Sequence, residues 1–320
     1  MPDTPSTPST PDSSSTPGSP GSPGSAGSAG SAGSPDAPTA PEAAAAPAVD
    51  DRAVLGHLVD VWERATADVV ALLRSLGPDD WDRPTDLPGW DVRAVASHLA
   101  HLESELAGNP QQQVEVPEAA HVRGLMGQFT EAGVVARAGW TTDAVVDELE
   151  SSVATRLAGL RADPPTDASA PGPGFAGLIG WSWRTLLSNR PLDVWVHEQD
   201  VRRAVGRPGG LDSPAAAHVV DVLARALPFV LGKKVGAEPG RSVRLVVTGE
   251  QPLDVAAVVG PDGRGVRCDV PEAPTATLEM DTETFVVRSS GRRDAADLTV
   301  AVSGDPDLAR RVLDALATTP

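Results

Sequence analysis

Two residues that can bind a metal, Asp193 and His197, are four positions apart in the segment P-L-D-V-W-V-H-E-Q-D-V-R-R-A-V-G-R-P, which begins at Pro191. Pro191 is typical of a first helical position, because its fixed φ suits a helix and its missing N–H needs no partner there; Gly206 and Pro208 predict the end of that helix. Residues at i and i+4 lie one turn apart, roughly 5–6 Å between Cβ atoms. A carboxylate oxygen and a ring nitrogen at this spacing can reach one divalent cation.

The same residues also have purely structural explanations. In the expected helix Asp193 lies in the first turn, where the helix dipole stabilises a carboxylate without any metal. His197 is equally suited to be a core histidine beside Trp195. Two nearby acids, Glu198 and Asp200, can orient an imidazole or can be ordinary surface charges. A metal site therefore needs a third ligand from another part of the chain.

The segment S-H-L-A-H-L-E contains two further histidines, His98 and His101. They follow a turn signal at Pro88-Gly89, and Asp91 is typical of the N-cap of the helix that would hold them. The apolar residues of this helix recur at helical spacing: Val92, Val95, Ala96, Leu99 and Leu102. A buried imidazole needs a partner for at least one ring nitrogen. From this pattern alone, each histidine is as well explained by a place on a helix face as by a role as a ligand.

The stretch P-G-W-D-V-R-A-V-A-S-H-L, followed roughly a hundred residues later by D-V-W-V-H-E-Q-D-V-R-R-A-V-G-R-P, resembles the mycothiol-dependent maleylpyruvate isomerase family of DinB-like metal-binding four-helix bundles. The resemblance runs from about residue 50 to the C-terminus. It implies that His98, Asp193 and His197 are the metal ligands, and it leaves His101 outside the site. These ligand atoms should then lie within about 3–5 Å of one another. The isomerase carries Glu at the acid position, so the shorter Asp193 is a departure that leaves the substrate open.

The resemblance implies a metal-dependent enzyme, with zinc as the favoured divalent ion. Mycothiol would be its thiol cosubstrate, and the reaction would be an isomerisation or an S-transfer on a small electrophilic substrate. Two imidazoles and one carboxylate leave open coordination positions, as in catalytic zinc sites. A hypothesis of a different class is a non-catalytic module that binds a small ligand, with the metal absent or structural. The sequence defines neither the oligomeric state nor catalytic residues beyond the metal ligands.

Apolar residues at intervals of three and four predict a helical bundle over residues 49–235. The expected helices cover 54–76, 91–107, 116–138, 144–160, a part of 178–206 that begins near Pro191, and 213–231, where Ser213 or Asp212 is the N-cap.

After Gly240 the period changes to two, which predicts a second domain over residues 240–320. Strands are expected over 243–247, 253–259, 266–270, 276–280 and 298–302, and helices over 281–289 and 305–317. This layout resembles the sterol-carrier-like C-terminal domain of the isomerase family. The predicted fold class is therefore α + (α+β): a DinB-like up-down helical bundle followed by a small α+β sterol-carrier-like domain.

Composition narrows the classes of function. The net charge of −18 repels phosphate backbones, so nucleic acid is not expected as a partner. The chain has one cysteine, Cys268, which excludes a disulfide framework and a Cys-based zinc knuckle. We expect no stretch of about eighteen apolar residues that could span a membrane and no signal peptide, so the expected location is cytoplasmic. The excess of arginine over lysine and the abundant alanine suggest an actinobacterial source.

Residues 1–48 consist mainly of Pro, Ser, Thr, Ala and Gly, and they lack large apolar side chains that could offset chain entropy. We expect a disordered tail that the folded part does not need. Deletion of residues 1–48 should therefore leave the thermal midpoint and the metal content nearly unchanged. Differential scanning calorimetry and elemental analysis of the full and shortened chains test this expectation, and a large loss of stability would show that the tail docks.

Overall fold

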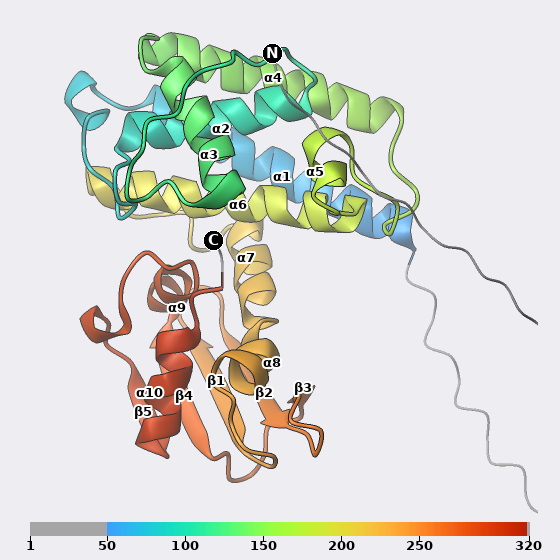
Figure 1. Cartoon of the computed structure of the whole chain (residues 1–320), viewed down its shortest axis with the longest axis vertical. Helices are drawn as coiled ribbons and strands as arrows, with labels where there is room; N and C mark the ends of the chain where they lie inside the picture. The colour runs from blue at the N-terminus through green and yellow to red at the C-terminus, as the bar shows by residue number, and fades with distance from the viewer. Residues whose placement is uncertain (1–49, 319–320) are drawn as a thin grey trace, which may run out of the picture. The chain divides into compact units, whose positions relative to one another are not determined.

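Four long helices pack side by side as a bundle in the first part of the chain (Figure 1). The computed structural model describes residues 50–318, so the expected tail lies outside the described residues. Each long helix packs against two of the others, α1 against α4 and α6, and α2 against the same two. Their bounds are α1 (Asp51–Arg74), α2 (Val92–Leu106), α4 (Thr142–Ala162) and α6 (Trp183–Val205). The predicted helical N-terminal region is confirmed.

Short polar side chains fix where these helices begin. Asp91 accepts a hydrogen bond from the Ala94 N–H, as its predicted N-cap role requires. Ser182 caps α6 in the same way through the Thr185 N–H. Because Ser182 starts α6 well before Pro191, the prediction that Pro191 opens this helix is wrong.

The earlier start of α6 changes the position of the candidate metal pair. Pro191 lies inside the helix, about two turns from its N-terminus, and leaves the carbonyl of Leu187 without its usual N–H donor. Asp193 is therefore not a first-turn residue. Since the helix dipole acts within the first turn, it does not explain a carboxylate at this position.

A short helix, α3 (Gly124–Arg137), packs on α2, and only this part of the expected helix 116–138 forms. Gly124 has a left-handed φ of 63°, which a continuous right-handed helix does not contain. The one-turn helix α5 (Gly174–Leu178) meets α3 through a stack of Phe129 on Phe175, whose ring centroids are 4.3 Å apart.

The last part of the chain forms a mixed five-stranded sheet in the order β3-β2-β1-β4-β5. Only the β1–β4 pair is parallel among these strands, and the other pairs are antiparallel. The bounds are β1 (Ser242–Thr248), β2 (Leu253–Val259), β3 (Gly265–Cys268), β4 (Ala276–Asp281) and β5 (Ala301–Gly304). The predicted small α+β region is confirmed, although β5 begins three residues later than the periodicity suggests.

The helical segments α8 (Leu227–Phe229), η2 (Val230–Lys234), α9 (Thr282–Ser289) and α10 (Pro306–Ala315) pack on strands of this sheet, and α7 (Pro214–Ala224) packs on α1, α6 and α9. Ser213, one of the two expected caps, accepts a hydrogen bond from the Ala216 N–H at the start of α7. α10 packs on β4 and β5, while α9 contacts β1, β4 and α7.

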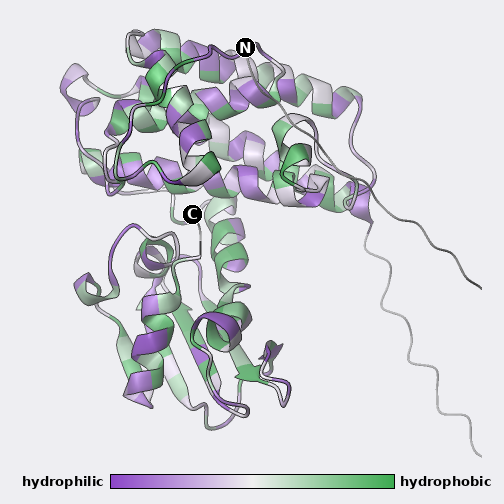
Figure 2. Ribbon diagram, in the orientation of Figure 1, coloured by the Kyte–Doolittle hydropathy of each residue, from purple (hydrophilic) through white to green (hydrophobic). Residues whose placement is uncertain are grey.

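By length and composition alone, the helical run Pro214–Lys234, which has 21 residues, is apolar enough to cross a membrane. The expectation that no such run exists is wrong in this respect. Half of its most apolar window is buried inside the protein. The run includes α7, whose apolar colouring in Figure 2 matches its packing against α1, α6 and α9. Packing in the protein core accounts for its hydrophobic character.

Gly133 lets α3 approach α2 closely, because a Cβ at this position would lie 2.3 Å from the ring of His101. We expect Gly133→Ala to lower the free energy of unfolding by about 1–3 kcal/mol through overpacking. Gly56→Ala is the control, because Gly56 lies in α1 with nothing within 4 Å of the added carbon. Alanine has a higher helix propensity than glycine, so Gly56→Ala should raise the free energy of unfolding by roughly 0.5–1 kcal/mol. Urea unfolding measures both, and a Gly133 variant as stable as the Gly56 variant would contradict the close approach.

Candidate metal centre

The structure brings His98 of α2 together with Asp193 and His197 of α6. One ligand atom from each of the three side chains lies within 4.8 Å of the other two. Asp193 Oδ1 is 3.5 Å from His98 Nε2 and 3.7 Å from His197 Nε2. The expected convergence is confirmed, while the role of these residues as metal ligands stays a prediction.

His98 is a buried imidazole without a hydrogen bond. Its side chain is 4% exposed, and neither ring nitrogen has a hydrogen-bond partner among residues 50–318. Burial lowers the pKa of His98 to about 4, although the charge of Asp193 opposes this shift. The ring is therefore neutral near pH 7 and keeps a lone pair available. Because buried polar atoms almost always have partners, an unpartnered ring facing a carboxylate and a second imidazole fits a site for a cation.

His197 is oriented by Asp200, one of the two acids considered for this role. Its Nδ1 lies 3.0 Å from Asp200 Oδ2, and Asp200 is fully buried. Burial would raise the pKa of Asp200, but the hydrogen bond from His197 and the charge of Arg292 outweigh it and hold that pKa below its usual range. An ionised carboxylate only accepts hydrogen bonds, so Nδ1 carries a proton and Nε2 is the ring nitrogen that faces the cluster.

Asp193 divides its two oxygens between different partners. Arg190 Nη1 donates to Oδ2 at 3.1 Å, and Oδ1 is the oxygen nearest the two imidazoles. Burial would raise the pKa of Asp193, but Arg190 and then His98 outweigh it and hold this pKa far below its usual range. The carboxylate is therefore charged at physiological pH and can serve as an anionic ligand.

Two arginines that follow α9 reach the helical region. Arg292 donates to Asp200 Oδ2 at 2.9 Å, and Arg293 pairs with Asp86. Arg203 of α6 donates to both of these acids. The acid that orients His197 is thus held from α6 and from the region of the sheet at the same time.

Trp90, the tryptophan of the P-G-W motif, packs beside both site histidines. Its ring centroid is 5.0 Å from that of His98 and 6.0 Å from that of His197. Its indole N–H donates to Glu131 Oε2 at 2.8 Å, and His121 Nε2 lies 3.3 Å from the same oxygen. Glu131 belongs to α3, so this helix fixes one wall of the site.

His101 lies outside the cluster, as expected. Its Nδ1 is 2.9 Å from Gln111 Oε1, and its ring is 5.0 Å from that of Phe129. Its Nε2 has no hydrogen-bond partner among residues 50–318, but the ring is not one of the three that converge, and it packs against Gly133 of α3.

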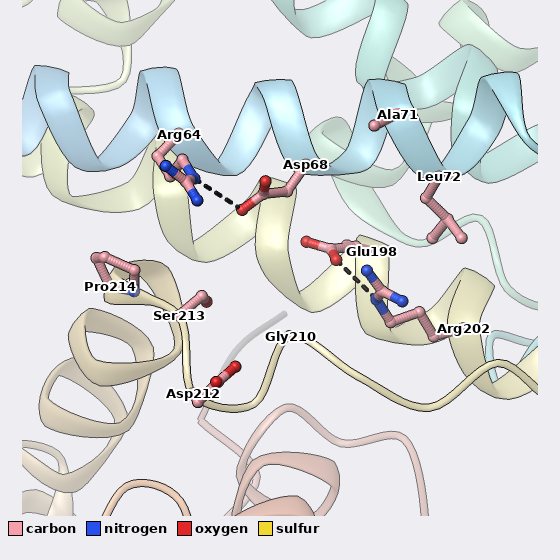
Figure 3. A pocket seen from close by; sticks show the side chains of 10 residues that line it. All are labelled: Arg64, Asp68, Ala71, Leu72, Glu198, Arg202, Gly210, Asp212, Ser213 and Pro214. Atoms are coloured by element: carbon pink, nitrogen blue, oxygen red, sulfur yellow. Dashed lines mark hydrogen bonds and ion pairs between the residues drawn. The ribbon is translucent and has the colours of Figure 1, made fainter.

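Glu198, the other acid considered for orienting an imidazole, does not contact one. It accepts a hydrogen bond from Arg202 at 2.7 Å beside a separate cavity of about 400 Å³ (Figure 3). This cavity lies between α1, α6 and the segment 210–214, and none of the three candidate ligands lines it. Its walls carry charges of both signs, which pair with each other as Arg64–Asp68 and Arg202–Glu198.

The sequence reasoning missed the arginines of the site and Glu131. The sequence spacing could have indicated two of these arginines. Arg190 is three residues from Asp193 and Arg203 is three residues from Asp200, and this spacing places two side chains on one face of a helix. Arg292 and Glu131 had no such local signal, since both come from separate elements that only the tertiary structure places beside the site.

Residues 62–202 match the family described as "Mycothiol maleylpyruvate isomerase N-terminal domain". Two crystal structures of the mycothiol-dependent maleylpyruvate isomerase, one of them a histidine-to-alanine mutant, are similar to the chain with TM-scores of 0.48 and 0.49. Their sequence identities are 18% and 16%, and each alignment covers 78% of this chain and 92% of the other. No curated protein matches the chain. The family match confirms the resemblance drawn from the two motifs.

The low pKa of His98 predicts an acid-sensitive fold. The imidazole titrates near 6.5 in the unfolded chain and near 4 in the folded one, so between these values only the unfolded chain binds the proton. The free energy of unfolding of the metal-free protein should therefore fall as the pH is lowered through this window, by up to about 3 kcal/mol.

Urea unfolding in the presence of a chelator, at several pH values between about 7 and 4.5, measures this loss. His98→Gln should flatten the slope of stability against pH, while the change of an exposed histidine, His57→Gln, should retain it. Equal slopes in the two variants would contradict the assignment to His98.

Proposed function

We propose, from the match of residues 62–202 to the family described as "Mycothiol maleylpyruvate isomerase N-terminal domain", that the protein is a metal-dependent, mycothiol-using enzyme. It acts on a small electrophilic substrate as an isomerase or an S-transferase. The single observation that carries the metal dependence is the buried, unpartnered ring of His98 beside Asp193 and His197.

The donor set supports zinc as the metal. Two neutral imidazoles and one carboxylate are typical of catalytic zinc sites, where three protein ligands leave a position open. A site with Ca²⁺ or Mg²⁺ would be built mainly from oxygen ligands. We therefore assign His98, Asp193 and His197 as the ligands of a divalent cation, with zinc as the first choice.

The protein groups around this site favour chemistry with a thiol. A divalent cation bound here supplies the positive charge that keeps a thiol ionised at neutral pH. His98 stays neutral, Asp200 fixes the ring of His197, and Trp90 limits access from one side. A thiolate beside these residues would add to one carbon of a double bond conjugated to a carbonyl, and the electron pair of that double bond would move to the carbonyl oxygen as an enolate, which leaves a single bond that can rotate. Return of the electron pair with loss of the thiolate would complete an isomerisation, whereas protonation of the enolate from solvent and release of the adduct would complete a transfer.

We also propose the domain organisation and the location. Residues 49–235 form the DinB-like metal-binding bundle, and residues 240–320 form the sterol-carrier-like domain, preceded by the tail of residues 1–48. The protein is cytoplasmic, of actinobacterial origin, and binds neither nucleic acid nor membranes. The change from helices to strands after Gly240 supports the boundary between the two folded domains.

Metal analysis of the purified protein tests the proposal most directly. If Asp193 is a ligand, Asp193→Asn should weaken metal binding by more than the roughly 10–100-fold that is typical of changes around a ligand, because an amide oxygen is a poor zinc ligand. Asp193→Glu restores the residue of the isomerase and should retain the metal. Asp60→Asn, on the exposed face of α1, is the control and should bind as the wild type does.

Competition with a chromophoric chelator gives these affinities, and a panel of electrophiles with and without mycothiol identifies the reaction. Equal affinity in the wild type and in Asp193→Asn would reject the ligand role. A wild type that binds no metal but retains a small apolar ligand would favour the non-catalytic module.

A further inference from the structure

A cluster of four charges extends inward from the candidate metal centre, and three of its four side chains are buried. It contains two carboxylates, Glu103 and Asp193, and two guanidinium groups, Arg156 and Arg190. The Glu103 side chain is completely buried, and those of Arg190 and Arg156 are 3% and 5% exposed. Charges so deep in a helical interior are costly unless each is paired in good geometry.

Glu103 is the fixed point of this cluster. Arg190 donates to its Oε1 from Nε at 3.0 Å and from Nη2 at 2.8 Å. Trp62 Nε1 donates to the same oxygen at 2.9 Å, and Arg156 Nη1 donates to Oε2 at 2.7 Å. Burial would raise the pKa of Glu103, but Arg190 and Arg156 outweigh it and lower that pKa, so the acid is ionised.

Arg190 uses its remaining terminal nitrogen on Asp193. The guanidinium is planar and rigid, so a group held by Glu103 through two nitrogens presents Nη1 in one direction only. This direction meets Asp193 Oδ2 at 3.1 Å and leaves Oδ1 on the side of the two imidazoles.

We propose that Arg190 is a positioning residue, which Glu103 holds in place and which aims a single oxygen of Asp193 at the metal. The inference rests on the proposed function, because it needs Asp193 to be a ligand. It explains why the cluster is buried: Asp193 is a short side chain on the same helix as His197, and its carboxylate needs an outside partner to fix its rotation. An outer partner of this kind is a regular part of metal sites.

The test compares Arg190→Lys with Arg156→Lys. Both variants keep a positive charge on Glu103 and lose the planar fork, but only Arg190 contacts Asp193. We expect Arg190→Lys to weaken zinc binding by about 10–100-fold. The zinc affinity of Arg156→Lys should stay within about twofold of that of the wild type, because the substitution keeps the positive charge and Arg156 does not contact Asp193. Chelator competition measures the affinities, and far-UV circular dichroism first confirms that each variant is folded.

A second comparison shows whether Arg190 acts through Asp193. In the Asp193→Asn background, Arg190→Lys should cause no additional loss of zinc affinity, because the group that it positions is gone. Equal losses with and without Asp193 would overturn the proposal, as would equal affinities of Arg190→Lys and the wild type. If Arg190→Lys does not fold, Arg190→Gln, which leaves Glu103 paired with Arg156, replaces it and should show the same loss. A wild type that binds no zinc would instead reject the proposed function.

Discussion

The structure around the site depends on one constraint: the three carboxylates beside the two histidines, Glu103, Asp193 and Asp200, stay ionised in the interior, and each therefore needs a cation. Asp193 has Arg190, Asp200 has Arg203 and Arg292, and Glu103 shares Arg190. Burial without these partners would protonate the acids or expel them from the interior. The arginines therefore decide which oxygen atoms remain free to face the two histidines.

α6 carries most of this arrangement on one face. Arg190, Asp193, His197, Asp200 and Arg203 follow at intervals of three and four, so that neighbours in this series hydrogen bond or approach each other along the helix. The helix thus buries a polar row beside its apolar residues, contrary to the usual pattern of an amphipathic helix. This row is paired from three elements. His98 and Glu103 of α2 face Asp193 and Arg190, Arg292 pairs with Asp200, and Asp86 pairs with Arg203.

Periodic apolar residues predicted the long helices and the mixed sheet region. The convergence of His98 with Asp193 and His197 followed from the family resemblance of the two motifs, because spacing alone did not distinguish His98 from His101. The sequence prediction failed at α6, where Pro191 is a good N-terminal residue but tertiary packing keeps it inside a longer helix. The spacing of apolar residues also does not show which polar side chains of different helices and loops will hydrogen bond to each other. Glu131 and Arg292 are ordinary surface charges in the sequence, and they become part of the site only when α3 and the segment after α9 reach it.

The contact of Arg292 gives the C-terminal region a role in the geometry of the helical one. Asp200 accepts hydrogen bonds from His197, Arg203 and Arg292, so removal of Arg292 leaves a buried acid with one guanidinium in place of two. Arg203 also holds Asp86, and Asp86 precedes Trp90 in the same loop. A shift of the segment after α9 would therefore reach both His197 and the loop that carries Trp90. Since a carboxylate in a dry interior follows its cations, the orientation of His197 is a property of the two regions together.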